Sequence, residues 1–136
     1  MEKITIKTTI NAPIEKVWVY WTEPEHITNW NAATDEWHCP SANNDLRKGG
    51  TFTSRMEAKD GSMGFDFSGV YLDVVQGELI AYDLDDGRNV KLNFVKEGNK
   101  TIIEEIFQPE SSNPLEMQRA GWQAILDNFK KYVESN

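Results

Sequence analysis

The sequence predicts an α+β fold in which one long C-terminal helix covers a curved antiparallel sheet of about six to seven strands. Residues 115–133 carry apolar side chains at three- and four-residue steps, which is the pattern of an amphipathic helix. The segments before it alternate apolar and polar residues between turn sequences, as antiparallel strands do. Two short helical patterns follow the first of these segments.

The N-terminal elements are predicted from alternation and from proline. Residues 4–10 alternate apolar and polar side chains, which indicates a half-buried strand. Pro13 suits the first turn of a helix, and Pro24 ends that helix and begins a second short one that carries Ile27 and Trp30. The apolar face of the first helix has helical spacing and consists of Ile14, Val17, Trp18 and Trp21.

The middle of the chain reads as a meander of strands. Glycine-containing turns separate apolar stretches at a spacing of roughly twelve residues, which favours consecutive hairpins. The predicted strands are a segment from residue 37 to the polar loop 45–50, and residues 52–57, 65–75, 79–84, 90–94 and 101–107. The helix at 115–133 then has to cover the sheet alone, so we expect a hollow between them.

Composition predicts one soluble domain spanning residues 1–136. The chain has 136 residues, 39% hydrophobic and 26% charged, and no apolar run approaches the ~18 residues that a membrane span needs. The N-terminus opens into an alternating strand rather than a signal sequence, and Cys39 is the single cysteine. We therefore expect a cytoplasmic protein without stable membrane insertion. The net charge of −8 argues against a nucleic-acid partner.

Four motifs, in order along the chain, resemble one superfamily. They are Asn11-Ala12-Pro13-Ile14-Glu15-Lys16-Val17-Trp18 with Trp21 to Ile27 and Trp30, then Asp45 to Gly50, then Phe67 to Tyr71, and last Asn113-Pro114 with Gln118 to Trp122 and Ile125-Leu126. Together they resemble the START-like (SRPBCC) superfamily, and in particular the branch of homologues of the activator of the heat-shock protein 90 ATPase.

This resemblance implies a helix-grip fold, in which a curved sheet wraps around the C-terminal helix over a deep apolar cavity. It implies binding of a hydrophobic or amphipathic small molecule that is lipid-, polyketide- or flavonoid-like, without a cofactor. Two alternatives stay open: a chaperone-activator-like protein-interaction module and an enzyme of the polyketide cyclase or dehydratase type. The branch often has a second aromatic residue where this chain has Asn31, so the resemblance implies an altered cavity entrance.

The aromatic residues are the main candidates for ligand contact. Five Trp, four Tyr and six Phe are many for this length, and they either line a cavity or pack a solid core. Gln118 interrupts the apolar stripe of the last helix, so it bonds to water or to a strand end, or it holds the polar end of a ligand. The candidate ligand-binding residues are Trp18, Trp21, Trp30, Trp37, Phe65, Phe67, Tyr82, Phe94, Gln118 and Trp122.

No catalytic or metal motif stands out. His38 and Cys39 are neighbours on a predicted strand, so their side chains point to opposite faces, and His26 is distant in the sequence. Glu104 and Glu105 are adjacent on another strand, so one of them faces the concave side, either in the cavity or at its wet rim. We expect a binding protein with no metal. If the protein is an enzyme, Glu104 or Glu105 is the candidate acid-base group.

Overall fold

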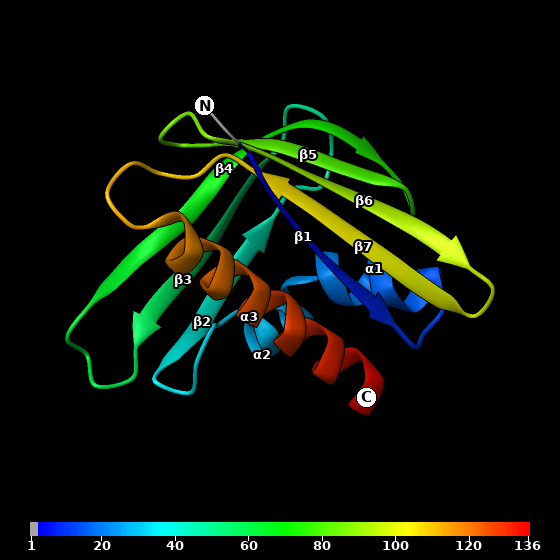
Figure 1. The fold of residues 1–136 in the computed structure, drawn as a ribbon, viewed down its shortest axis with the longest axis horizontal. Helices are drawn as coiled ribbons and strands as arrows, with labels where there is room; N and C mark the ends of the chain where they lie inside the picture. Colours follow the sequence, from blue (N-terminus) through cyan, green and yellow to red (C-terminus); the bar gives the residue numbers. More distant parts are fainter. Residues whose placement is uncertain (1–2) are drawn as a thin grey trace.

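Seven antiparallel strands form one curled sheet in the computed structural model, which describes residues 3–136. Two short helices follow the first strand, and a long helix ends the chain (Figure 1). The elements are β1 (Ile4–Ile10), α1 (Ile14–Thr22), α2 (Pro24–Trp30), β2 (Trp37–Asn44), β3 (Thr51–Ala58), β4 (Gly64–Val75), β5 (Leu79–Leu84), β6 (Asn89–Glu97), β7 (Lys100–Phe107) and α3 (Leu115–Ser135). The α+β fold and the order of its elements predicted from the sequence are confirmed.

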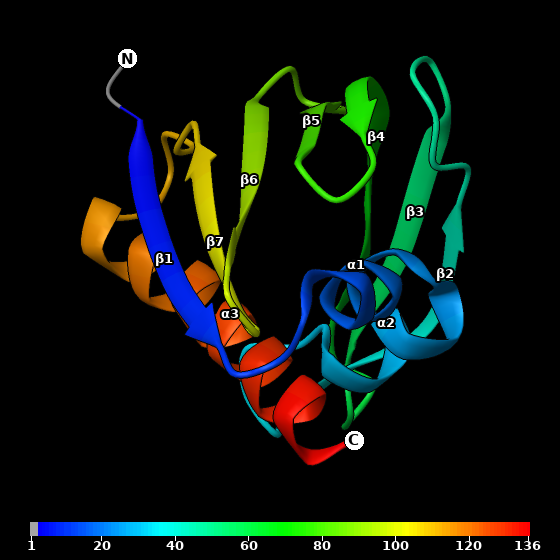
Figure 2. The ribbon, with the colours of Figure 1, turned by 90° about the vertical axis from the view of Figure 1, so that its right-hand side faces the viewer.

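The sheet curls into a half-barrel because it combines a meander with one long-range pair. Its order is β1-β7-β6-β5-β4-β3-β2, so β2 to β7 are consecutive hairpins and β1 closes against β7. The register shifts between His38 and Ser41 in β2 and between Tyr71 and Asp73 in β4, and such irregularities bend strands. In Figure 2 the strands curve around the helices, which lie across the concave side.

The three helices meet in an aromatic cluster on the concave side of the sheet. α3 packs along β1, α2 packs against β2, and both short helices touch α3. The ring of Phe129 on α3 is fully buried and meets Trp21 of α1 edge-on, with 4.8 Å between ring centroids. It meets Trp30 of α2 in the same way at 4.9 Å. This cluster fixes the helices near the two edges of the sheet.

Two glycines are required by the backbone around the sheet. A Cβ at Gly69 would lie 2.3 Å from the Asp83 carbonyl oxygen and 3.1 Å from the ring of Phe52, so only glycine lets this ring pack across β4. Gly87 has a φ of 90° in the β5–β6 turn, a conformation that other residues rarely adopt. Gly69, which lies in the Phe67 to Tyr71 motif, is therefore required for the packing of Phe52 on the concave face.

Gln118 fixes the loop between β7 and α3. Its side chain is buried, and its Oε1 accepts a hydrogen bond from the Glu110 backbone N–H at 2.8 Å. Its Nε2 donates to the carbonyl oxygens of Glu110 at 3.0 Å and Asn113 at 2.8 Å. The inward-facing position predicted for this amide is correct, and its partners are loop backbone atoms.

We expect Gln118→Leu to lower the free energy of unfolding by about 1 to 3 kcal/mol, because three backbone groups of the loop lose their partner. Met117→Leu, at the neighbouring exposed position, should change it by less than about 0.5 kcal/mol. Urea unfolding of both variants measures the difference. Equal stability of the two variants would contradict this account of the loop.

Candidate functional site

A cavity of about 370 Å³ lies between the concave face of the sheet and the helices. Volumes of this size are typical of small-molecule sites, which are mostly apolar with a few polar groups. The wall has an aromatic and aliphatic part and a smaller polar part. The apolar part consists of Trp21, Ile27, Trp30, Phe52, Met56, Phe65, Phe67, Tyr71, Ile80, Tyr82, Trp122 and Ile125. The polar part consists of Asn31, Asn43, Asn44, Ser54, Arg88, Glu105, Glu110, Asn113 and Gln118.

Aromatic stacking holds the apolar wall in place. Trp21 and Trp30 stack on each other with centroids 4.7 Å apart. On the opposite side Trp122 of α3 lies flat on Phe107, with centroids 3.9 Å apart and planes 7° from parallel. The edge of Phe67 meets the same indole at 6.1 Å. Because each ring is packed on a neighbour, the wall keeps its shape without a ligand.

Seven of the ten residues predicted to contact a ligand line this cavity: Trp21, Trp30, Phe65, Phe67, Tyr82, Gln118 and Trp122. The other three, Trp18, Trp37 and Phe94, do not line the cavity. Trp18 packs edge-on against Phe94, with centroids 5.2 Å apart, and both are buried in the core between α1 and β6. Trp37 begins β2 and meets the exposed Phe65 at 5.9 Å. The aromatic character of a residue therefore did not by itself distinguish cavity-lining residues from core residues.

Several lining residues were missed by the sequence analysis. Phe52 and Met56 lie on β3 and Ile80 on β5, and their alternation had placed them on one face of a strand without showing which face is concave. Tyr71 lies in the Phe67 to Tyr71 motif, and its hydroxyl donates to Asn44 Oδ1 at 2.5 Å. Asn31, which departs from the family pattern, follows α2 and contributes a polar group to the wall.

The two adjacent glutamates of β7 lie on opposite faces of the sheet. Glu104 faces outward, where its Oε2 pairs with Lys7 Nζ at 3.3 Å. Glu105 faces the cavity between Ile6 of β1 and Leu92 of β6 and is 5% exposed. Burial raises the pKa of Glu105 to about 8, because the apolar surroundings disfavour its charged form.

Glu105 and Tyr82 have no hydrogen-bond partner for their side-chain oxygens among residues 3–136. Tyr82 lies on β5, is 7% exposed and lines the same cavity. No fully enclosed side-chain nitrogen or oxygen of the described residues lacks a partner, so these oxygens reach the open space of the cavity. Burial raises the pKa of Tyr82 well above its usual value, and the nearby Glu105 charge adds to this shift.

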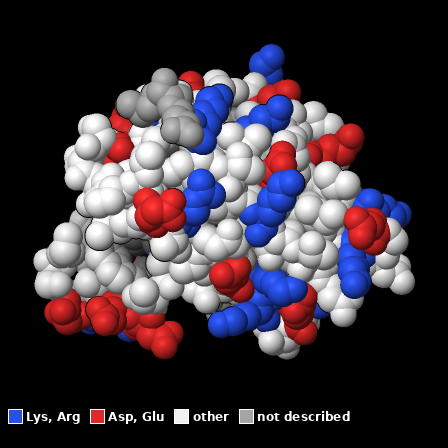
Figure 3. Space-filling view, in the orientation of Figure 1, with Lys and Arg blue, Asp and Glu red and all other residues white. Residues whose placement is uncertain are grey.

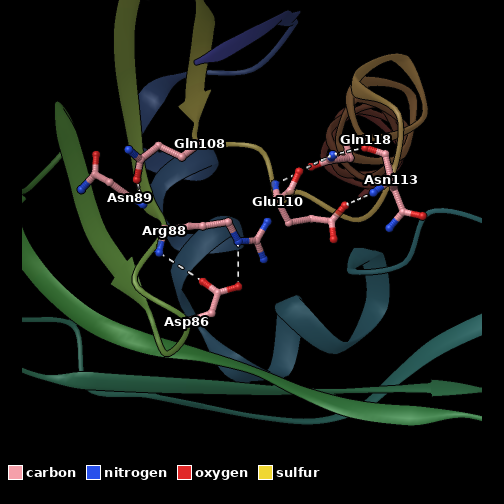
Figure 4. Close-up of polar contacts among 7 residues, drawn as sticks. All are labelled: Asp86, Arg88, Asn89, Gln108, Glu110, Asn113 and Gln118. Atoms are coloured by element: carbon pink, nitrogen blue, oxygen red, sulfur yellow. Dashed lines mark hydrogen bonds and ion pairs between the residues drawn. The ribbon is translucent and has the colours of Figure 1, made fainter. Parts of the chain in front are cut away.

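Charged residues border the cavity on the side of the β5–β6 turn (Figure 4). Arg88 Nε donates to Asp86 Oδ2 at 2.8 Å, and its side chain is 23% exposed. In Figure 4 the Arg88 guanidinium points in the direction of the loop that carries Glu110. Although desolvation acts the other way, hydrogen bonds from Asn113 and Ser112 lower the pKa of Glu110, so this carboxylate is charged at neutral pH.

The remaining candidates for metal or nucleophilic chemistry lie away from this cavity. Glu23, Glu25 and His26 have side chains close enough to share a metal ion, but both carboxylates are exposed and His26 Nδ1 hydrogen-bonds with the Tyr132 hydroxyl at 2.7 Å. Cys39 is buried, and desolvation raises the pKa of its thiol, which makes it a poor nucleophile. On the face in Figure 3, Lys and Arg lie among Asp and Glu rather than in one basic patch.

The chain matches a known family over nearly its whole length. The model of the family described as "Activator of Hsp90 ATPase homolog 1-like protein" matches residues 11–134. A solution structure of a protein of this type from Aeromonas hydrophila is 45% identical and has a TM-score of 0.92, with 98% of this chain and 93% of that chain covered. A solution structure from Cytophaga hutchinsonii is 56% identical with a TM-score of 0.86 and the same coverage of 98% and 93%.

A crystal structure of a protein from Chromobacterium violaceum shares the fold at 22% identity, with a TM-score of 0.88 and 100% of both chains covered. No curated protein sequence matches this chain. The family match, the half-barrel and the position of the long helix agree with the resemblance seen in the sequence motifs. The chain therefore belongs to the Activator of Hsp90 ATPase homolog 1-like family, which is of the START-like (SRPBCC) type.

Proposed function

We propose that this protein binds an apolar or amphipathic small molecule in its cavity. The observation that carries the proposal is the volume of about 370 Å³, which the protein's own side chains leave open behind a wall of packed aromatic rings. Each Å² of apolar ligand surface removed from water there contributes roughly 25 cal/mol. Lipid-, polyketide- and flavonoid-like compounds have the apolar surface that such a wall binds, and the proposal needs no cofactor.

An enzymatic role is the second candidate, and the placement of Glu105 favours it. A carboxyl group with a pKa of about 8 exchanges its proton near neutral pH, which suits a general acid or base. Of the two glutamates considered from the sequence, Glu105 is the acid-base candidate, since Glu104 lies on the other face of the sheet. A chaperone partner, which the family description suggests, stays a prediction.

A cytoplasmic location is part of the proposal. None of the helices that the structure describes is long and apolar enough to cross a membrane. The single cysteine is buried as a free thiol, which fits a reducing compartment.

Binding of naringenin and dodecanoate, measured by isothermal titration calorimetry, tests the proposed function. We expect a negative heat-capacity change, because apolar surface leaves water. Ile125→Trp enlarges a side chain of the cavity wall and should weaken the binding of both probes roughly tenfold or more. Ala120→Trp, at an exposed position of the same helix, should leave the affinities unchanged. No binding of either probe, or equal effects of the two substitutions, would contradict the proposal.

Glu105→Gln tests the ionisation of the cavity carboxyl through stability. Between pH 4.5, its ordinary pKa, and about 8, the folded protein keeps a proton that the unfolded chain has released. The free energy of unfolding should therefore fall with rising pH in this window relative to the variant, by at most about 1.4 kcal/mol per pH unit. The difference in the free energy of unfolding between the protein and the variant should not depend on pH below pH 4.5 or above about pH 8.

Urea unfolding from about pH 4 to about pH 9 measures this difference. Glu104→Gln is the matched control, because it removes a glutamate of the same strand that pairs with Lys7 and does not line the cavity. A stability difference between the protein and Glu105→Gln that stays constant over the whole range would show that Glu105 has the same pKa in the folded protein as in the unfolded chain.

A further inference from the structure

The polar groups deep in the cavity indicate what kind of ligand it takes. We propose that the cavity selects ligands whose buried end carries an oxygen acceptor, such as a ketone carbonyl, and that this oxygen accepts hydrogen bonds from the Glu105 carboxylic acid and the Tyr82 hydroxyl. This inference rests on the proposed function and narrows its ligand class from apolar molecules in general to those with a buried carbonyl-type oxygen.

The first support is that both groups are buried and without partners in the protein. Glu105 is 5% exposed and Tyr82 is 7% exposed, yet neither side-chain oxygen is hydrogen-bonded to any of the described residues. Because both oxygens reach the open cavity, whatever fills the cavity has to supply their hydrogen bonds. A ligand with an acceptor oxygen at this end supplies them, whereas a hydrocarbon leaves both groups without a partner.

The second support is that the two groups converge. Tyr82 pairs with Val90 across β5 and β6, and Glu105 of β7 pairs with Leu92, the next inward-facing residue of β6. The two residues therefore lie two strands apart on the concave face, offset by one pair. On a concave face such side chains lean toward each other, and the charge of Glu105 contributes to the raised pKa of Tyr82, which requires proximity.

The third support is the protonation state of the pair. Both groups are protonated at neutral pH, because burial raises both of their pKa values, that of Glu105 to about 8. Each is then a hydrogen-bond donor, and a protonated carboxylic acid beside a tyrosine in an apolar site is an arrangement suited to a carbonyl or enolate oxygen. A ligand amine fits less well, since it would have to ionise Glu105 in the apolar wall.

Among residues 3–136, three other titratable or charged groups face this cavity. They are Tyr71 of β4, Arg88 of the β5–β6 turn and Glu110 of the loop before α3. Desolvation raises the pKa of Tyr71, which keeps it neutral, and Glu110 is ionised at neutral pH. The neighbours of Glu105 on β1 and β6 are Ile6 and Leu92, and α3 contributes no titratable group to the wall.

Three naphthalenes of nearly equal shape test the inference: 2-acetylnaphthalene, 2-isopropenylnaphthalene and 1-(2-naphthyl)ethylamine. The first has a carbonyl, the second replaces its oxygen by a methylene group, and the third carries an amine. We expect the ketone to bind most tightly in calorimetric titrations at pH 7. Glu105→Leu and Tyr82→Phe should each lower the ratio of ketone affinity to hydrocarbon affinity roughly threefold to tenfold, because each removes one hydrogen-bond donor. Glu104→Leu, on the outer face, should change neither affinity.

Two further measurements on the unsubstituted protein need no variant. The ratio of ketone affinity to hydrocarbon affinity should be constant below about pH 7 and fall above about pH 8, as Glu105 loses the proton that it donates to the ketone. The infrared carbonyl stretch of bound 2-acetylnaphthalene should lie below its frequency in hexane, as hydrogen bonding requires.

The outcomes separate this inference from the proposed function. If the ketone and the hydrocarbon bind with equal affinity, or if the bound carbonyl keeps its frequency in hexane, the cavity binds apolar molecules without a hydrogen bond to an oxygen. The inference is then wrong, while the proposed function still holds. If the amine binds most tightly, the inference is also wrong, because Glu105 then pairs with a cationic group of the ligand. If none of the three probes binds, the proposed function fails and the inference fails with it.

Discussion

One helix cannot fill the concave face of a seven-stranded half-barrel, and this constraint determines the rest of the structure. α3 packs along β1 at one edge, while α2 covers β2 at the other, and Phe129 joins the helices through Trp21 and Trp30. The middle of the concave face, formed by β3, β4 and β5, is left to side chains alone, and a cavity of about 370 Å³ remains there.

The position of Glu105 gives this cavity its chemistry. The alternation of β7 is strict, so a glutamate between Ile6 and Leu92 has to face inward, and its neighbour Glu104 has to face the solvent. Burial without a partner lowers stability at neutral pH, since the folded state gives up the solvation of an ionised carboxylate. A leucine at this position would avoid that cost, which is why we assign the carboxyl to ligand recognition rather than to the fold.

Much of the fold could be predicted from the sequence, but the site could be predicted only in part. Alternation, glycine turns and the spacing from Leu115 to Val133 determine the elements locally, and all of them form in the predicted order. The same alternation shows that Glu104 and Glu105 lie on opposite faces without showing which face is concave. Trp18 and Trp21 lie on the same helix, yet only Trp21 reaches the cavity, because the direction of α1 depends on contacts far away in sequence. Arg88 carries no signal of its own, since its place follows from the turn around Gly87.

The central claim is that Glu105 is a neutral acid in an apolar cavity at physiological pH. The ¹³C chemical shift of its side-chain carboxyl, followed by NMR as the pH is raised, reports its protonation directly, and Glu104 on the outer face of the same strand provides a reference signal. We predict that the Glu105 signal titrates near pH 8, above the ordinary value of 4.5 for glutamate. A midpoint near 4.5, the ordinary value for glutamate, would contradict the account of the cavity and of the ligand it selects.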